Sequence, residues 1–129
     1  MPLYWTIDTK QRFFTGVAEG EVTFDDAIAL LEALAAVKAL SYRKLFDGRA
    51  ARSTMTGEEL LAVCAKIRAY HDQEPVGALA TVATSEQFET CARLWGALAA
   101  ADRPMKMFTN LQQARTWLDQ QPAVPRGPG

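Results

Sequence analysis

The chain has few of the residues on which catalytic and metal sites usually depend. Its 129 residues include one histidine and two cysteines. Cys64 and Cys91 fall in separate apolar patterns, unlike the ligand spacing of a structural zinc site or the dense cysteines of a disulfide scaffold. Neither the Walker pattern nor the dinucleotide-binding glycine pattern occurs. The sequence therefore predicts no metal, no cofactor and no catalytic residue, and we expect a protein that is not an enzyme.

The single histidine does not change this expectation. His71 follows Cys64 on the same face of a predicted helix, about 10 Å further along its axis at 1.5 Å per residue. That separation is too long for a hydrogen bond between a nucleophile and its base. We expect His71 to interact with the end of its own helix or to lie partly buried there, and both cysteines to be reduced and structural.

Long apolar runs and a strong net charge are also missing. No uninterrupted apolar stretch reaches about 18 residues, so we expect no stable membrane insertion. The beginning of the sequence lacks the basic segment and apolar run of a signal peptide, which favours a cytoplasmic protein. The formal net charge of −1 provides no basic field for nucleic acid. Hydrophobic residues make up 49% of the chain, as in a globular domain.

What the sequence does contain is an alternation of strand-like and helix-like segments. Residues 1–121 read as one domain, and the Pro/Gly-rich residues 122–129 read as a disordered tail. The predicted strands are Leu3 to Asp8, Arg12 to Ala18, Tyr42 to Phe46, Val76 to Ala83 and Met105 to Phe108. The predicted helices run from Phe24 to Lys38, from Gly57, from Thr84 or Ser85, and from Asn110.

The resulting order of elements is ββαβαβαβα. Strands joined by helices pair in parallel through right-handed crossovers, whereas the short first connection indicates an antiparallel hairpin. We therefore predict an α/β fold with a mainly parallel sheet and an antiparallel N-terminal strand.

A cluster of basic and hydroxyl residues precedes the second long helix. From Lys38 to Arg52 the charged residues are Lys38, Arg43, Lys44, Arg49 and Arg52, opposed only by Asp47. The hydroxyl residues Ser53, Thr54 and Thr56 follow, and Thr56-Gly57-Glu58-Glu59 matches a capping box. Two interpretations stay open. The segment is an ordinary polar loop with Thr56 as a helix cap, or it is an edge that binds an anion or an acidic partner.

The order of elements and several residues resemble the STAS domain and its SpoIIAA-like, anti-sigma-factor-antagonist relatives. The similarity spans residues 3 to 119 and includes Gly20-Glu21-Val22-Thr23-Phe24 before a helix and a strand that ends in Leu45-Phe46-Asp47. Met107-Phe108-Thr109-Asn110 before the last helix also matches. The resemblance lies in order and spacing, since no single motif in it is specific.

The resemblance implies a SpoIIAA-like (βα) superhelix and a non-enzymatic regulatory role. Such domains bind a partner protein and are often switched by phosphorylation, and a homodimer is compatible with that role. By position, Thr56 is the counterpart of the phosphoacceptor, although Met55 stands where the family has aspartate and its glycine is displaced to Gly57. The fold is shared with lipid-carrier domains, so a small carrier of a lipid or other apolar ligand is the alternative function.

Overall fold

A five-stranded sheet with helices on both faces forms the centre of the computed structural model. The structure describes residues 3–53, 55–87 and 104–121. The strands are β1 (Leu3–Asp8), β2 (Phe13–Val22), β3 (Arg43–Ser53), β4 (Leu79–Val82) and β5 (Met105–Phe108). The helices are α1 (Phe24–Ala36), α2 (Gly57–Gln73) and α4 (Leu111–Asp119), with a short 3-10 helix η1 (Ser85–Gln87) after β4.

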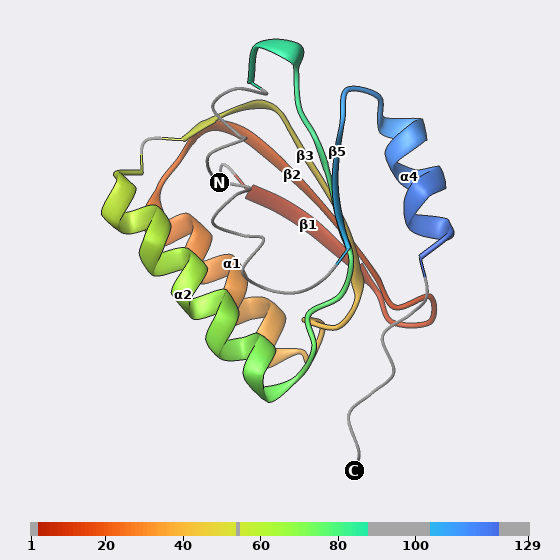
Figure 1. Cartoon of the computed structure of the whole chain (residues 1–129), viewed down its shortest axis with the longest axis horizontal. Helices are drawn as coiled ribbons and strands as arrows, with labels where there is room; N and C mark the ends of the chain where they lie inside the picture. The colour runs from red at the N-terminus through yellow and green to blue at the C-terminus, as the bar shows by residue number, and fades with distance from the viewer. Residues whose placement is uncertain (1–2, 54, 88–103, 122–129) are drawn as a thin grey trace.

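The strands lie in the sheet in the same order as in the chain. β1 pairs with β2 antiparallel, and β2 to β5 are parallel. Right-handed crossovers that advance in one direction along a sheet place their helices on one face. α1 and α2 accordingly lie side by side on one face, and α4, which joins no further strand, lies on the other (Figure 1). The predicted fold class and strand pairing are confirmed.

Two apolar layers lie on either side of the sheet because successive strand residues point to opposite faces. Phe13 belongs to the layer under α4, with Leu45, Val82, Ala114 and Leu118. Its neighbour Phe14 belongs to the layer under α1, together with Leu34, Ala39, Leu40 and Tyr42. Two adjacent residues of β2 therefore contribute one side chain to each core.

The end of β3 differs from the prediction. We expected a strand that stops at Phe46, followed by a basic loop, but β3 continues to Ser53 and pairs with β2 as far as Val22. The expectation was wrong because the segment after Asp47 is polar and contains Gly48, so it lacks the apolar alternation of a strand. Pairing with β2, which includes a register shift between Val17 and Glu19, holds it extended instead.

The other element boundaries differ less from their predicted positions. β4 is restricted to Leu79–Val82, although Val76 and Ala78 before it are buried. α1 ends at Ala36 rather than Lys38. The greater part of the third predicted helix, including Cys91, and the predicted tail lie outside the described residues.

Candidate binding site

The predicted site residues converge where β3 ends and α2 begins. Arg49 and Arg52 lie on the last part of β3, Ser53 is its final residue, and Thr56 precedes the first turn of α2. Thr54 lies outside the described residues. We call the described residues of this region, Arg49, Arg52, Ser53 and Thr56 with Glu21 of β2 beside them, the binding edge.

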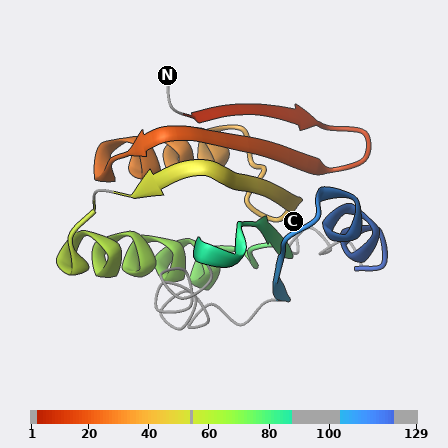
Figure 2. The ribbon, with the colours of Figure 1, turned by 90° about the horizontal axis from the view of Figure 1, so that it is seen from above.

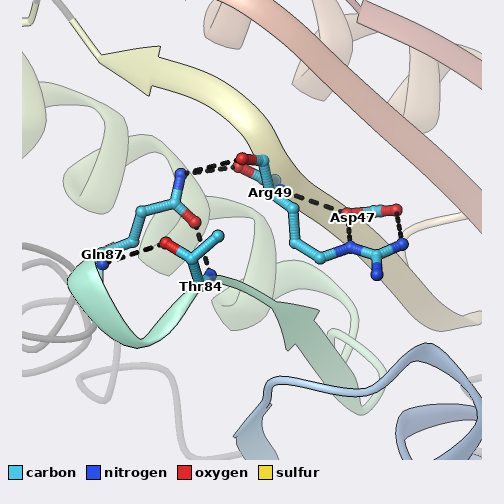
Figure 3. A network of polar contacts seen from close by, with 5 residues as sticks. Asp47, Arg49, Thr84 and Gln87 are labelled. Carbon is cyan, nitrogen blue, oxygen red and sulfur yellow. Dashed lines mark hydrogen bonds and ion pairs between the residues drawn. The ribbon is translucent and has the colours of Figure 1, made fainter.

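Arg49 is already engaged by a neighbouring carboxylate. Its Nη2 lies 2.8 Å from Asp47 Oδ2, its Nε donates to Oδ1 at 3.0 Å, and its backbone amide donates to the same oxygen at 3.1 Å. Hydrogen bonding from the Arg49 side chain lowers the pKa of Asp47, and partial burial opposes that effect. This fork of two parallel bonds is a strong ion-pair geometry, so Arg49 is held in place (Figure 3).

Arg52 is the more accessible of the two arginines. Its Nη2 lies 3.2 Å from Glu21 Oε1 on the facing position of β2, and the two side chains are 75% and 57% exposed. Pairs this exposed contribute little to stability and exchange easily for other partners. Arg52 is therefore the residue of the binding edge best placed to meet an incoming anionic group.

Thr56 caps α2. Its hydroxyl accepts from the Glu59 amide at 3.2 Å, and the Glu59 carboxylate accepts from the Thr56 amide at 2.9 Å. Both halves of the predicted capping box are present. The box satisfies two amides at the start of the helix and supports the structural interpretation of Thr56, whose residue surface is nonetheless exposed.

Gln87 completes this region, although it was not among the residues predicted from the sequence. Its Nε2 donates to the carbonyl oxygens of Gly48 at 3.0 Å and Ala51 at 2.9 Å, where β3 extends beyond its pairing with β4. Its Oε1 accepts from the backbone amide of Thr84 at 2.7 Å, and the backbone amide of Gln87 donates to the Thr84 hydroxyl at 3.3 Å (Figure 3). Thr84-Ser85-Glu86-Gln87 is a capping-box pattern, which could have identified Gln87 but not its contacts with β3.

Behind the binding edge lies an apolar cavity of about 300 Å³ between the sheet and the pair α1 and α2. Ala27 and Leu31 of α1, Val63 of α2 and Ala51 of β3 are among the residues that line it. Lys44 also lines the cavity and is only 5% exposed. Its Nζ donates to the carbonyl oxygens of Leu40 and Tyr42, so the buried charge is hydrogen-bonded.

The remaining candidate residues have structural roles. His71 Nδ1 accepts from the Val76 amide at 3.1 Å and thereby holds the turn after α2. Cys64 is buried, and desolvation raises the pKa of its thiol. Within residues 3–53, 55–87 and 104–121, no group of three or more His, Cys, Asp or Glu residues could hold a metal ion. No helix in that part of the chain is long and apolar enough to cross a membrane.

Comparison with solved structures relates this architecture to known proteins. The chain resembles an uncharacterised protein of the DUF3478 family with a SpoIIAA-like fold from Shewanella loihica, with a TM-score of 0.63 over 90% of this chain and 93% of the other, at 17% identity. The fold is SpoIIAA-like.

The chain also resembles the solved structure of an anti-sigma factor antagonist from Mycobacterium paratuberculosis. Its TM-score is 0.55, its identity 20%, and the match covers 92% of this chain and 95% of that one. No protein-family model and no curated protein sequence matches the chain. At identities of 17% and 20% these similarities show the fold alone.

Proposed function

We propose that the protein is a non-enzymatic regulatory module that binds a partner protein through the binding edge. The observation that carries this proposal is Arg52, whose side chain remains 75% exposed beside the start of α2 and, among the residues that the structure describes, forms an ion pair with the exposed Glu21 alone. An acidic side chain or phosphate of a partner would compete for it by a charge-assisted hydrogen bond. The anti-sigma factor antagonist with the same fold supports a regulatory role.

The test compares two double variants of equal charge change. Arg49→Ala with Arg52→Ala removes the basic groups of the binding edge, and Lys10→Ala with Arg68→Ala removes two exposed basic groups elsewhere. Each protein is used for affinity capture from its native host, and the captured proteins are identified. We expect one partner to be lost only with the binding-edge variant. Equal capture by both variants would place the partner surface elsewhere.

Thr56 is the proposed switch within this edge. A phosphate there would lie next to a helix N-terminus, which favours negative charge, and next to Glu59, which repels it. Because Glu59 occupies the capping box, phosphorylation would replace the box by a contact with Arg52 or with the partner. Replacement of Thr56 by glutamate is expected to change partner affinity, whereas Thr56→Ser is expected to preserve it.

The role of Thr56 as the cap of α2 leads to a separate prediction about stability. Thr56→Ala removes the hydroxyl that accepts from the Glu59 amide, so we expect the free energy of unfolding to fall by about 0.5–2 kcal/mol. Thr56→Ser keeps the oxygen and should retain most of the stability. Urea denaturation of the three proteins measures the difference, and equal stability of the alanine variant would contradict the capping role.

A second candidate function, a small carrier of a lipid or other apolar ligand, is favoured by the cavity. An apolar cavity of about 150 Å³ already accommodates a benzene-sized ligand, and this one measures about 300 Å³. Its wall is overwhelmingly apolar, so an acyl chain or another hydrocarbon fits its chemistry better than a polar metabolite.

Ala27→Phe, which projects a ring into the cavity, is compared with Ala36→Phe at an exposed position of the same helix. Native mass spectrometry and a fluorescent fatty-acid analogue report binding. A carrier should bind in the wild type and in Ala36→Phe but not in Ala27→Phe. Absence of binding in the wild type would exclude the carrier and leave the interaction module.

A further inference from the structure

The two edges of the sheet differ in how they are protected against pairing. An edge strand exposes unpaired backbone N–H and C=O groups, and proteins commonly protect it by shortness, proline or lysine. β5 has four residues and contains Lys106, and a proline directly precedes each edge strand in the sequence, Pro104 before β5 and Pro2 before β1. β1 has six residues, Leu3–Asp8, with no proline or basic residue among them. In the part of the chain that the structure describes, no element pairs with the outer edge of β1.

Four of the six side chains of β1 are apolar, and Thr6 and Asp8 are the polar ones. Tyr4 is 51% exposed on one face, and Trp5 and Ile7 on the other face are only partly buried by the core under α1. Asp8 is the single charged residue of the strand, and its carboxylate already accepts from the amides of Lys10 and Gln11, at 3.0 Å each. The edge therefore presents hydrocarbon and backbone groups rather than charge.

Helix α1 extends this apolar surface into a second layer. Phe24, Ala27 and Ile28 of α1 pack toward α2, so helical geometry places Ala29 and Ala33 on the opposite side of the helix. α1 lies over β2, with α2 toward β3 and β4, so that opposite side borders β1 (Figure 2). Val37, the C-cap of α1, is 56% exposed. The alanines would let another helix approach closely.

We propose that a second copy of this chain pairs with the outer edge of β1. A single extended peptide would cover the strand but leave the alanine side of α1 uncovered. A two-fold axis through the middle of β1 continues both layers, since it pairs β1 with the partner's β1 antiparallel and brings the two α1 helices together. The same axis puts the two Asp8 carboxylates at opposite ends of the strand pair, whereas parallel pairing in register would place them side by side. The surface is thus self-complementary in shape and charge.

The test is sedimentation equilibrium of the full chain over a range of protein concentrations. Tyr4→Lys with Thr6→Lys introduces charge at exposed positions of β1, and Ala33→Arg introduces charge at a partly exposed position of α1. Leu61→Lys is the control, because Leu61 is 61% exposed on α2, away from the edge. Like charges on paired strands repel, so we expect a dimer in the wild type and in Leu61→Lys, weakened at least about tenfold in both edge variants.

Hydrogen exchange provides a readout specific to the backbone. If the strands pair, exchange of the outward-facing amides of β1 slows as the wild-type concentration rises, but does not do so in the charge variants. A monomeric wild type at every concentration would overturn the proposal. The proposal would also be overturned if the β1 variant and the α1 variant, each shown by circular dichroism to be folded, still formed the dimer as the wild type does.

Discussion

At the scale of single residues, Gly77 is required by a close approach of two backbone segments. Its amide donates to the Leu40 carbonyl at 2.9 Å. A Cβ at this position would lie 2.3 Å from the Tyr42 carbonyl oxygen and 2.4 Å from that of Ser41. The carbonyls of Leu40 and Tyr42 also accept from Lys44. The absence of a side chain at Gly77 thus allows the segment before β4 to pack on the loop that holds the buried lysine.

Gly77→Ala should consequently destabilise the protein. Both carbonyl oxygens belong to the main chain and cannot move away by a change of rotamer. We therefore expect the free energy of unfolding to fall by about 1–3 kcal/mol or more. Gly57→Ala is the matched control, since its Cβ would meet nothing within 4 Å at the start of α2, and we expect a change of about 1 kcal/mol or less. Urea denaturation of both variants measures the contrast. Similar stability of the two would disprove the close-approach argument.

Asp47 provides a prediction for acid stability. The Arg49 side chain lowers the pKa of Asp47 in the folded protein below its ordinary value. A depressed folded pKa contributes stability above the unfolded pKa, and this contribution disappears as the pH falls through the folded pKa. Wild type should therefore melt higher than Asp47→Asn at neutral pH, and the difference should shrink below about pH 4.

Thermal melting between neutral and acidic pH checks the Asp47 prediction. Asp72→Asn, at an exposed position of α2, removes the same charge without touching Arg49. A pH-independent difference between wild type and Asp47→Asn would show that the carboxylate does not act through its ionised form.

At the scale of elements, the far half of β3 pairs with β2 on one side, and on the other side a side chain takes the place of β4. β3 pairs with β4 only from Lys44 to Asp47. Beyond that point Gln87 satisfies the carbonyls of Gly48 and Ala51 and simultaneously caps η1 through Thr84. The binding edge is therefore positioned by β2 on one side and by one glutamine on the other.

Gln87→Ala should cost about 1–3 kcal/mol of stability because it leaves partly buried carbonyls without their donor. Gln87→Glu should be equally harmful, since a carboxylate cannot donate to a carbonyl. Gln112→Ala at an exposed position of α4 is the control. Denaturation midpoints measure these effects. If Gln87→Glu were as stable as the wild type, the glutamine would not be holding the strand.

At the scale of the whole molecule, the sheet lies between two cores and contributes residues to both. Leu34 is 3% exposed in the core under α1, and Leu118 is 0% exposed in the core under α4. Phe13 and Phe14, neighbours on β2, contact one core each. Loss of either core would remove packing from the same strand.

We therefore expect Leu34→Ala and Leu118→Ala each to lower the stability of the whole protein by about 2–5 kcal/mol. Unfolding followed by circular dichroism and by tryptophan fluorescence should coincide in both variants. Leu61→Ala, at an exposed position, should change little. Separate transitions for the two probes would show that the two faces unfold independently.

The sequence alone determined the features that depend on neighbouring residues. Alternating and helical apolar patterns predicted the class of the fold, the order of its elements and the antiparallel first strand. Thr56 was predicted as a helix cap and is one, because a capping box is complete within four residues. The basic and hydroxyl residues of the binding edge could also be predicted, because they are close together in the sequence. The residues that they contact in the structure could not be predicted in this way.

Only the tertiary structure decided the features that join distant segments. β3 is extended to Ser53 because β2 pairs with it there, against the local preference of a polar segment. Gln87 contacts carbonyls more than thirty residues earlier in the chain, and Arg52 meets Glu21 across two strands. The cavity exists because two helices and a sheet meet around it. Such contacts arise from how the elements pack, and a local pattern of residues does not specify which distant segment will lie beside it.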